Sequence, residues 1–119
     1  MPRDDHHAEA TALLREAGGE RLVTSNHVRG ETWTFLRRKE GHARAVDFLD
    51  MLATTARVEV VPVSEELEGQ ALRWLRRHDE REYSFVDATS FALMRAMKIR
   101  EALGFDGDFT AAGFRERRS

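Results

Sequence analysis

Acidic side chains are the groups in this sequence that could carry chemistry, and the first of them is Glu31. It follows Val28 by three residues and precedes Phe35 by four. In a helix these spacings put the three side chains on one face, so the carboxylate lies on or near an apolar stripe. The alternative is a glutamate at the edge of that stripe with its charged end in water, and spacing alone favours this alternative.

A second acidic residue, Asp87, lies three residues after Ser84. This is the spacing of a helix capping box, in which hydroxyl and carboxylate each accept from the other residue's backbone N–H. The box explains both residues without any function. Asp87 also shares a helix face with Phe91 and Met94, which points it toward packed surface. The positive end of the helix stabilises a carboxylate there in either role.

Asp106 and Asp108 follow the apolar run 102–105. If that run forms a strand, Asp106 projects from its carboxyl end, where open α/β sheets bind ligands. The alternative is a turn aspartate beside Gly107. The sequence around Asp106 supports the two interpretations about equally.

Other residue types exclude several kinds of site. The chain has no cysteine, which excludes disulfides, thiolate metal sites and cysteine nucleophiles. Its five histidines lack the spacing of zinc ligands, and it contains no nucleophile elbow, Walker motif or dinucleotide glycine pattern. Basic clusters at 37–39, 73–77 and 115–118 could meet phosphates, but solvated surface is the more common role of such clusters.

Alternating helical and strand patterns predict the scaffold that must position these acids. Apolar and β-branched runs predict strands at 21–24, 57–63 and 99–105, and a last edge strand at 113–115. Helical spacing and capping residues predict helices at 7–17, 27–39, 42–55 and 84–97, and a helical turn at 109–112. A further helix opens at Ser64, with an apolar face of Leu67, Ala71, Trp74 and Leu75. This alternation is typical of an α/β domain with a mostly parallel sheet.

The composition predicts a single soluble domain over residues 1–119. The chain has only two prolines, no low-complexity linker and a formal net charge of −2, so it is neither polybasic nor acidic-tailed. No apolar run approaches the length of a membrane span, and the first residues lack the apolar core of a signal peptide. We therefore expect a cytoplasmic protein without membrane association.

Three longer stretches, taken in order, carry a resemblance to a known family. They are S-N-H-V-R-G-E-T-W-T-F-L-R-R (25–38), S-F-V-D-A-T-S-F-A-L-M (84–94) and A-L-G-F-D-G-D-F (102–109). Together they resemble the PIN-domain ribonucleases, particularly the VapC-like toxins of toxin–antitoxin pairs. The opening D-D-H-H-A-E-A (4–10) is similar to the family's first loop and helix. The resemblance covers nearly the whole chain and implies a PIN-like three-layer α/β/α sandwich.

The resemblance also implies a metal-dependent endoribonuclease that uses Mg²⁺ or Mn²⁺, hard cations that carboxylates hold. Glu31 matches the family's second-helix acid, Asp87 its fifth-helix acid and Asp106 the acid after its fourth strand. On this basis Asp87 and Asp106 are metal ligands. Glu31 binds the metal directly or through water and orients the attacking water, and Asp108 is an auxiliary ligand. Gly104 stands where the family often has a small hydroxylated residue.

The sequence departs from the family at its start. The family begins with a central apolar strand that ends in a catalytic Asp, whereas Met1 falls in the loop after that strand, and Asp4 and Asp5 match the loop. We therefore expect a sheet lacking its usual first strand, weak metal binding and little nuclease activity. Unpaired backbone in the middle of a sheet is costly unless another segment fills the gap.

The implied partners are an RNA substrate, an antitoxin protein and a second copy of the chain. Arg29 and Arg37, on the same helix as Glu31, could steer an RNA backbone.

Two alternative functions remain open: a non-catalytic PIN-like module that binds an antitoxin-like partner, and an unrelated domain whose acids are caps and turn residues. Trp33, Trp74 and Phe85 could make exposed apolar contacts, although core packing is the expectation for each.

Overall fold

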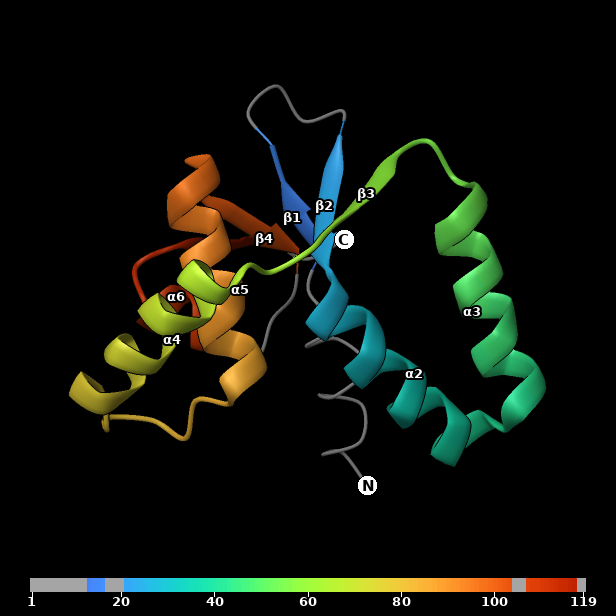
Figure 1. Cartoon of the computed structure of the whole chain (residues 1–119), viewed down its shortest axis with the longest axis horizontal. Helices are drawn as coiled ribbons and strands as arrows, with labels where there is room; N and C mark the ends of the chain where they lie inside the picture. Colours follow the sequence, from blue (N-terminus) through green and yellow to red (C-terminus); the bar gives the residue numbers. More distant parts are fainter. Residues whose placement is uncertain (1–12, 17–20, 104–106, 118–119) are drawn as a thin grey trace.

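Helices and strands alternate along the chain in the computed structural model, which describes residues 13–16, 21–103 and 107–117. The elements in chain order are β1 Leu13–Arg15, β2 Leu22–Ser25, α2 Asn26–Glu40, α3 His42–Thr54, β3 Val58–Val61, α4 Glu65–Arg77, α5 Phe85–Met97, β4 Glu101–Leu103, α6 Asp108–Ala111 and β5 Arg115–Arg117 (Figure 1).

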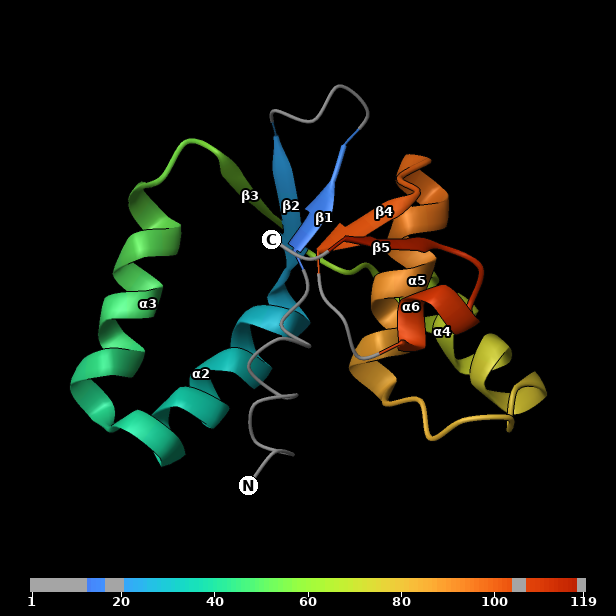
Figure 2. The same ribbon diagram turned by 180° about the vertical axis from the view of Figure 1, so that it is seen from behind.

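The strands form one sheet in the order β3-β2-β1-β4-β5. The β2/β3 and β4/β5 pairs are parallel, and β1 runs antiparallel to both β2 and β4, so the other four strands share one direction. Figure 1 shows α2 and α3 to one side of the strands and α4, α5 and α6 to the other, and Figure 2 shows the same division from behind. The predicted α/β sandwich with a mostly parallel sheet is confirmed.

The prediction of a helix over 7–17 is wrong for residues 13–15, which form β1; residues 7–12 and 17 lie outside the described part of the chain. Leu14 pairs with Val23 of β2 and Ala102 of β4, and its side chain is only 1% exposed. β1 therefore fills the central position that the sequence left without its usual strand. Pairing on both edges and burial of Leu14 outweigh a local helix preference worth only tenths of a kcal/mol per residue.

The other predicted helices are confirmed, and α2, α4 and α5 each begin at a serine cap, whereas α3 follows Gly41 without a side-chain cap. The Oγ of Ser25 accepts from the Val28 backbone N–H at 3.1 Å, and the Oγ of Ser64 accepts from that of Leu67 at 3.1 Å. Each hydroxyl satisfies a backbone donor that has no partner within its helix. Along the described residues, no helix is both long and apolar enough to cross a bilayer.

The main core surrounds Phe91, whose side chain is fully buried in the middle of α5. Its ring meets Trp74 of α4 at 5.1 Å, Phe109 of α6 at 5.0 Å and Phe114 at 5.7 Å between ring centroids. The expectation of core packing is thus correct for Trp74, whereas Phe85 is 37% exposed. These aromatic contacts fasten α4, α5 and α6 into one layer.

The carboxylate of Glu116 on β5 fixes the start of α6. It accepts from the backbone N–H groups of Gly107, Phe109 and Thr110 at 3.2, 2.8 and 3.0 Å. Gly107 has a φ of 88°, a conformation that suits glycine, and a Cβ there would lie 3.2 Å from the Arg81 guanidinium. Glu116 thereby satisfies donors that a short helix leaves open at its beginning.

Leu14→Ala is expected to lower the free energy of unfolding by about 3 kcal/mol, because it empties a buried site in the central strand. Urea denaturation followed by circular dichroism measures this. Leu72→Ala is the matched control, since Leu72 on α4 is 48% exposed and should change stability by less than about 0.5 kcal/mol. Equal effects of the two substitutions would show that β1 does not contribute to the folded core.

Glu116→Ala is expected to lower the free energy of unfolding by about 2 kcal/mol, since three backbone donors lose a charged acceptor. Amide hydrogen exchange should accelerate at Phe109 and Thr110. The control is Glu59→Ala, which removes only an exposed ion pair with Arg21 and should cost less than about 1 kcal/mol. Unchanged exchange at the start of α6 would refute the anchoring role.

Candidate functional site

Asp87 lies at the start of α5 within the predicted capping box, which the structure confirms. The Oγ of Ser84 accepts from the Asp87 backbone N–H at 2.9 Å, and Oδ2 of Asp87 accepts from the Ser84 backbone N–H at 3.0 Å. Asp87 is 9% exposed. An ionised carboxylate has about four acceptor positions, and the N–H of Ser84 uses one of them. The cap therefore fixes the carboxylate while leaving it chemically able to accept further partners.

Glu31 lies in the second turn of α2, which begins directly after β2. Val28 and Thr32 form the buried side of this helix, and the Thr32 hydroxyl donates to the Val28 carbonyl oxygen at 2.7 Å. Glu31 itself is exposed. The interpretation favoured by spacing, a glutamate at the edge of the apolar stripe, therefore describes its position.

The first turns of α2, α4 and α5 meet around His27. The His27 ring lies 5.5 Å from the Phe85 ring at 73°, and its Nε2 lies 3.0 Å from Oε2 of Glu68. His27 is one turn before Glu31 on α2, and Phe85 is two residues before Asp87 on α5. The helix starts that carry Glu31 and Asp87 are therefore neighbours.

A hydrogen bond from the chain after β3 completes this region. Oδ1 of Asn26 accepts from the Val63 backbone N–H at 2.9 Å, so the start of α2 is joined to the segment that leads from β3 to α4. Because β2 and β3 are parallel, their carboxyl ends meet at the same edge of the sheet. The acids of α2 and α5 thus lie where open α/β sheets bind ligands.

Sequence reasoning missed the roles of His27, Glu68 and the Asn26 side chain. No motif identified in the sequence assigns a role to Asn26, and His27 is only one of five histidines without zinc spacing. Their partners are 37 and 41 residues away in the sequence. Only the β2/β3 pairing brings these segments together, so no local pattern could have found them.

Of the two candidate acids that follow β4 in the sequence, the structure describes only one. Asp106 lies outside the described residues. Asp108 is the first residue of α6, and its Oδ1 accepts from Nε of Arg81 at 2.8 Å. This pairing with a cation from the α4–α5 loop gives Asp108 a structural role. Within 13–16, 21–103 and 107–117, no group of three His, Asp or Glu side chains is arranged to hold a metal.

The chemistry of the acid set nevertheless fits a hard divalent cation. Glu31, Asp87 and Asp106 offer only carboxylate oxygens, the ligands that Mg²⁺ and Mn²⁺ prefer in proteins. The described histidines do not form a competing cluster with them that would suit zinc.

Comparison with known families gives an extended match. Residues 2–115 match the PIN domain family. The 23S rRNA-specific endonuclease VapC20 of Mycobacterium tuberculosis is 60% identical over 98 residues, which cover 82% of this chain and 73% of that protein. A VapC ribonuclease of Archaeoglobus fulgidus is 27% identical over 112 residues, covering 91% of this chain and 70% of that protein.

The fold gives the same result. The crystal structure of M. tuberculosis VapC20, described as a sarcin–ricin loop cleaving toxin, superimposes with a TM-score of 0.79 at 56% identity. The match covers 84% of this chain and 76% of that one. By sequence and by fold, this chain belongs to the PIN-domain family and, within it, to the VapC-like group.

Proposed function

We propose that this chain is an endoribonuclease of the VapC type that hydrolyses RNA phosphodiester bonds with the help of Mg²⁺ or Mn²⁺. The observation that carries the proposal is the meeting of the α2 and α5 starts, which bear Glu31 and Asp87, in a chain 60% identical to a 23S rRNA-specific endonuclease. A bound cation supplies charge neutralisation at the phosphate and an activated water.

The proposed roles follow from the positions of the acids. Asp87, held by its cap, and Asp106, just beyond β4, are metal ligands. Glu31 is exposed on α2, binds the metal directly or through water, and orients the attacking water. Asp108 is an auxiliary acid only, because the guanidinium of Arg81 already pairs with it.

Arg29 and Arg37 are exposed on the helix that carries Glu31. Among the described residues neither arginine forms an ion pair, so both are available to RNA phosphates.

A second candidate function is a non-catalytic module that binds an antitoxin-like protein. The structural duties of Asp87 in the capping box and of Asp108 beside Arg81 favour it, since both acids have a role without metal. Met51, Leu72 and Phe85 are large apolar side chains exposed on three helices. Such side chains suit an antitoxin or a second copy of the chain as partner.

Glu31→Gln and Asp106→Asn are each expected to reduce RNA cleavage at least about 100-fold, because each removes a charge from the metal site. Cleavage of a labelled RNA in millimolar Mn²⁺, with EDTA as the metal-free reference, measures this. Asp47→Asn is the control, since Asp47 on α3 pairs only with Arg44 at the surface. Cleavage that persists in EDTA, or equally in all variants, contradicts the proposal. Absence of cleavage by the unaltered chain would support the binding module.

Two substitutions separate the chemical role of Asp87 from its capping role. Asp87→Asn keeps an oxygen that can accept from the Ser84 N–H but removes the charge, so it should abolish cleavage with little loss of stability. Ser84→Ala removes the hydroxyl cap and should cost about 1 kcal/mol of stability while preserving most cleavage. Thermal denaturation measures the stability of each variant, and the cleavage assay measures its activity. Retained cleavage by Asp87→Asn together with a loss of stability would make Asp87 purely structural.

A further inference from the structure

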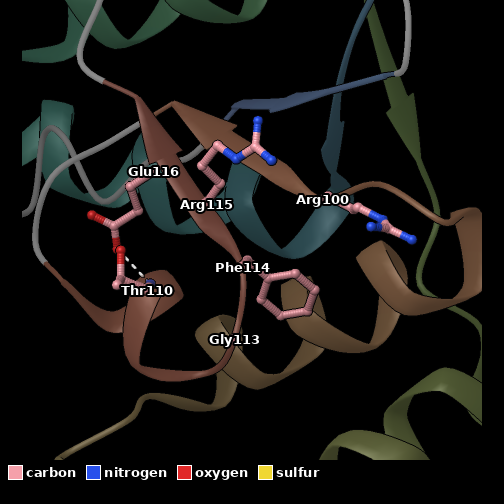
Figure 3. Close-up of a pocket in the computed structure, with 6 residues that line it drawn as sticks. All are labelled: Arg100, Thr110, Gly113, Phe114, Arg115 and Glu116. Carbon is pink, nitrogen blue, oxygen red and sulfur yellow. Dashed lines mark hydrogen bonds between the residues drawn. The ribbon is translucent and has the colours of Figure 1, made fainter.

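An open pocket of about 570 Å³ lies beside β5 and α6. Arg100 precedes β4 and Arg115 begins β5, so these two residues lie at the amino ends of the parallel strands. Glu116 and Thr110 extend the lining toward the start of α6. The pocket is lined by Arg100, Thr110, Gly113, Phe114, Arg115 and Glu116 (Figure 3).

The two arginines of this pocket are linked through the backbone. The Arg115 N–H donates to the Arg100 carbonyl oxygen at 2.8 Å, which fixes the two residues next to each other. Both side chains are exposed, and Figure 3 shows their guanidinium groups directed away from the Glu116 carboxylate. The link holds the two backbones side by side, so both exposed guanidinium groups start from the same end of the β4/β5 pair.

The nearby carboxylates are already engaged. Glu101, the residue after Arg100, forms an ion pair with Arg15 at 3.6 Å. Glu116, the residue after Arg115, accepts from three backbone N–H groups of the α6 start. In the part of the chain that the structure describes, neither Arg100 nor Arg115 has an ion-pair partner. Their positive charge is therefore available to a ligand.

The chain leading into the pocket adds positive charge. Arg95 lies in the last turn of α5, five residues before Arg100, and Lys98 is the C-cap of α5, two residues before Arg100. Burial, and then the charge of nearby Arg77, lower the pKa of Arg95. A polyanion approaching this end of α5 is attracted over a Debye length of about 8–10 Å.

We propose that Arg100 and Arg115 bind a phosphate of the RNA strand. This second RNA contact rests on the proposed ribonuclease function and adds to it two cations at the amino ends of β4 and β5. RNA is favoured over an acidic protein segment because the ring of Phe114, which stacks on Phe91 and is only partly buried, lines the pocket together with the two arginines. Cations that follow the backbone, combined with aromatic rings, characterise grooves for single-stranded nucleic acid.

Fluorescence anisotropy of a labelled single-stranded RNA in EDTA tests the proposal without interference from cleavage. Salt is varied between about 50 and 200 mM. For the Arg100→Ala/Arg115→Ala double variant, the slope of log affinity against log salt should be smaller by about 0.7, the value for one lost phosphate contact. Arg100→Lys/Arg115→Lys keeps both charges and should retain the slope of the unaltered chain.

Two further variants complete the design. Arg44→Ala is the control for lost charge, since Arg44 on α3 pairs with Asp47, and its slope should not change. Phe114→Leu keeps an apolar core residue and should weaken binding severalfold without changing the slope, because it removes a stacking surface. An unchanged slope in the folded double alanine variant overturns the proposal and leaves an acidic protein segment as the ligand. Altered slopes without any metal-dependent cleavage would overturn the proposed function alone.

Discussion

The middle of the sheet holds a strand that joins two halves of the molecule. In the sheet described, the parallel pair β2/β3 and the parallel pair β4/β5 meet only through β1, which bonds to both. The acid-bearing helix α2 follows β2, whereas α6 follows β4. The position of α2 relative to the β4/β5 pair therefore depends on three residues centred on Leu14, whose burial makes the junction rigid.

The capped first turns of the helices also position the acidic side chains. Each of the helices α2, α4 and α5 begins at a serine whose hydroxyl satisfies a free backbone N–H, so its first turn is fixed in place. The positive end of α5 also offsets the cost of holding the carboxylate of Asp87 in a largely buried position. The capping box that starts the helix thus also holds an anionic side chain in place, and the metal-binding role proposed for Asp87 would use that same carboxylate.

Much of this architecture could be predicted from the sequence because it depends on local signals. Ser64 and Ser84 predict the starts of α4 and α5 within a residue, the end of α5 is also predicted, and the Ser84–Asp87 box is visible as a spacing. β1 could not be predicted, because its residues favour a helix and only pairing with two distant strands makes them extended. The contacts of His27 with Glu68 and of Arg81 with Asp108 join residues 41 and 27 positions apart, and sequence spacing carries no information about them.

The central claim is that carboxylates from α2, from α5 and from the chain after β4 bind one divalent ion together. Paramagnetic broadening of backbone amide signals during a Mn²⁺ titration tests it most directly, because broadening reports distance to the ion and does not require cleavage. The account predicts that signals around Glu31, Asp87 and Gly107 broaden together, at the same Mn²⁺ concentration. Broadening confined to one of these segments, or centred on surface acids of α3 such as Asp47 and Asp50, would contradict it.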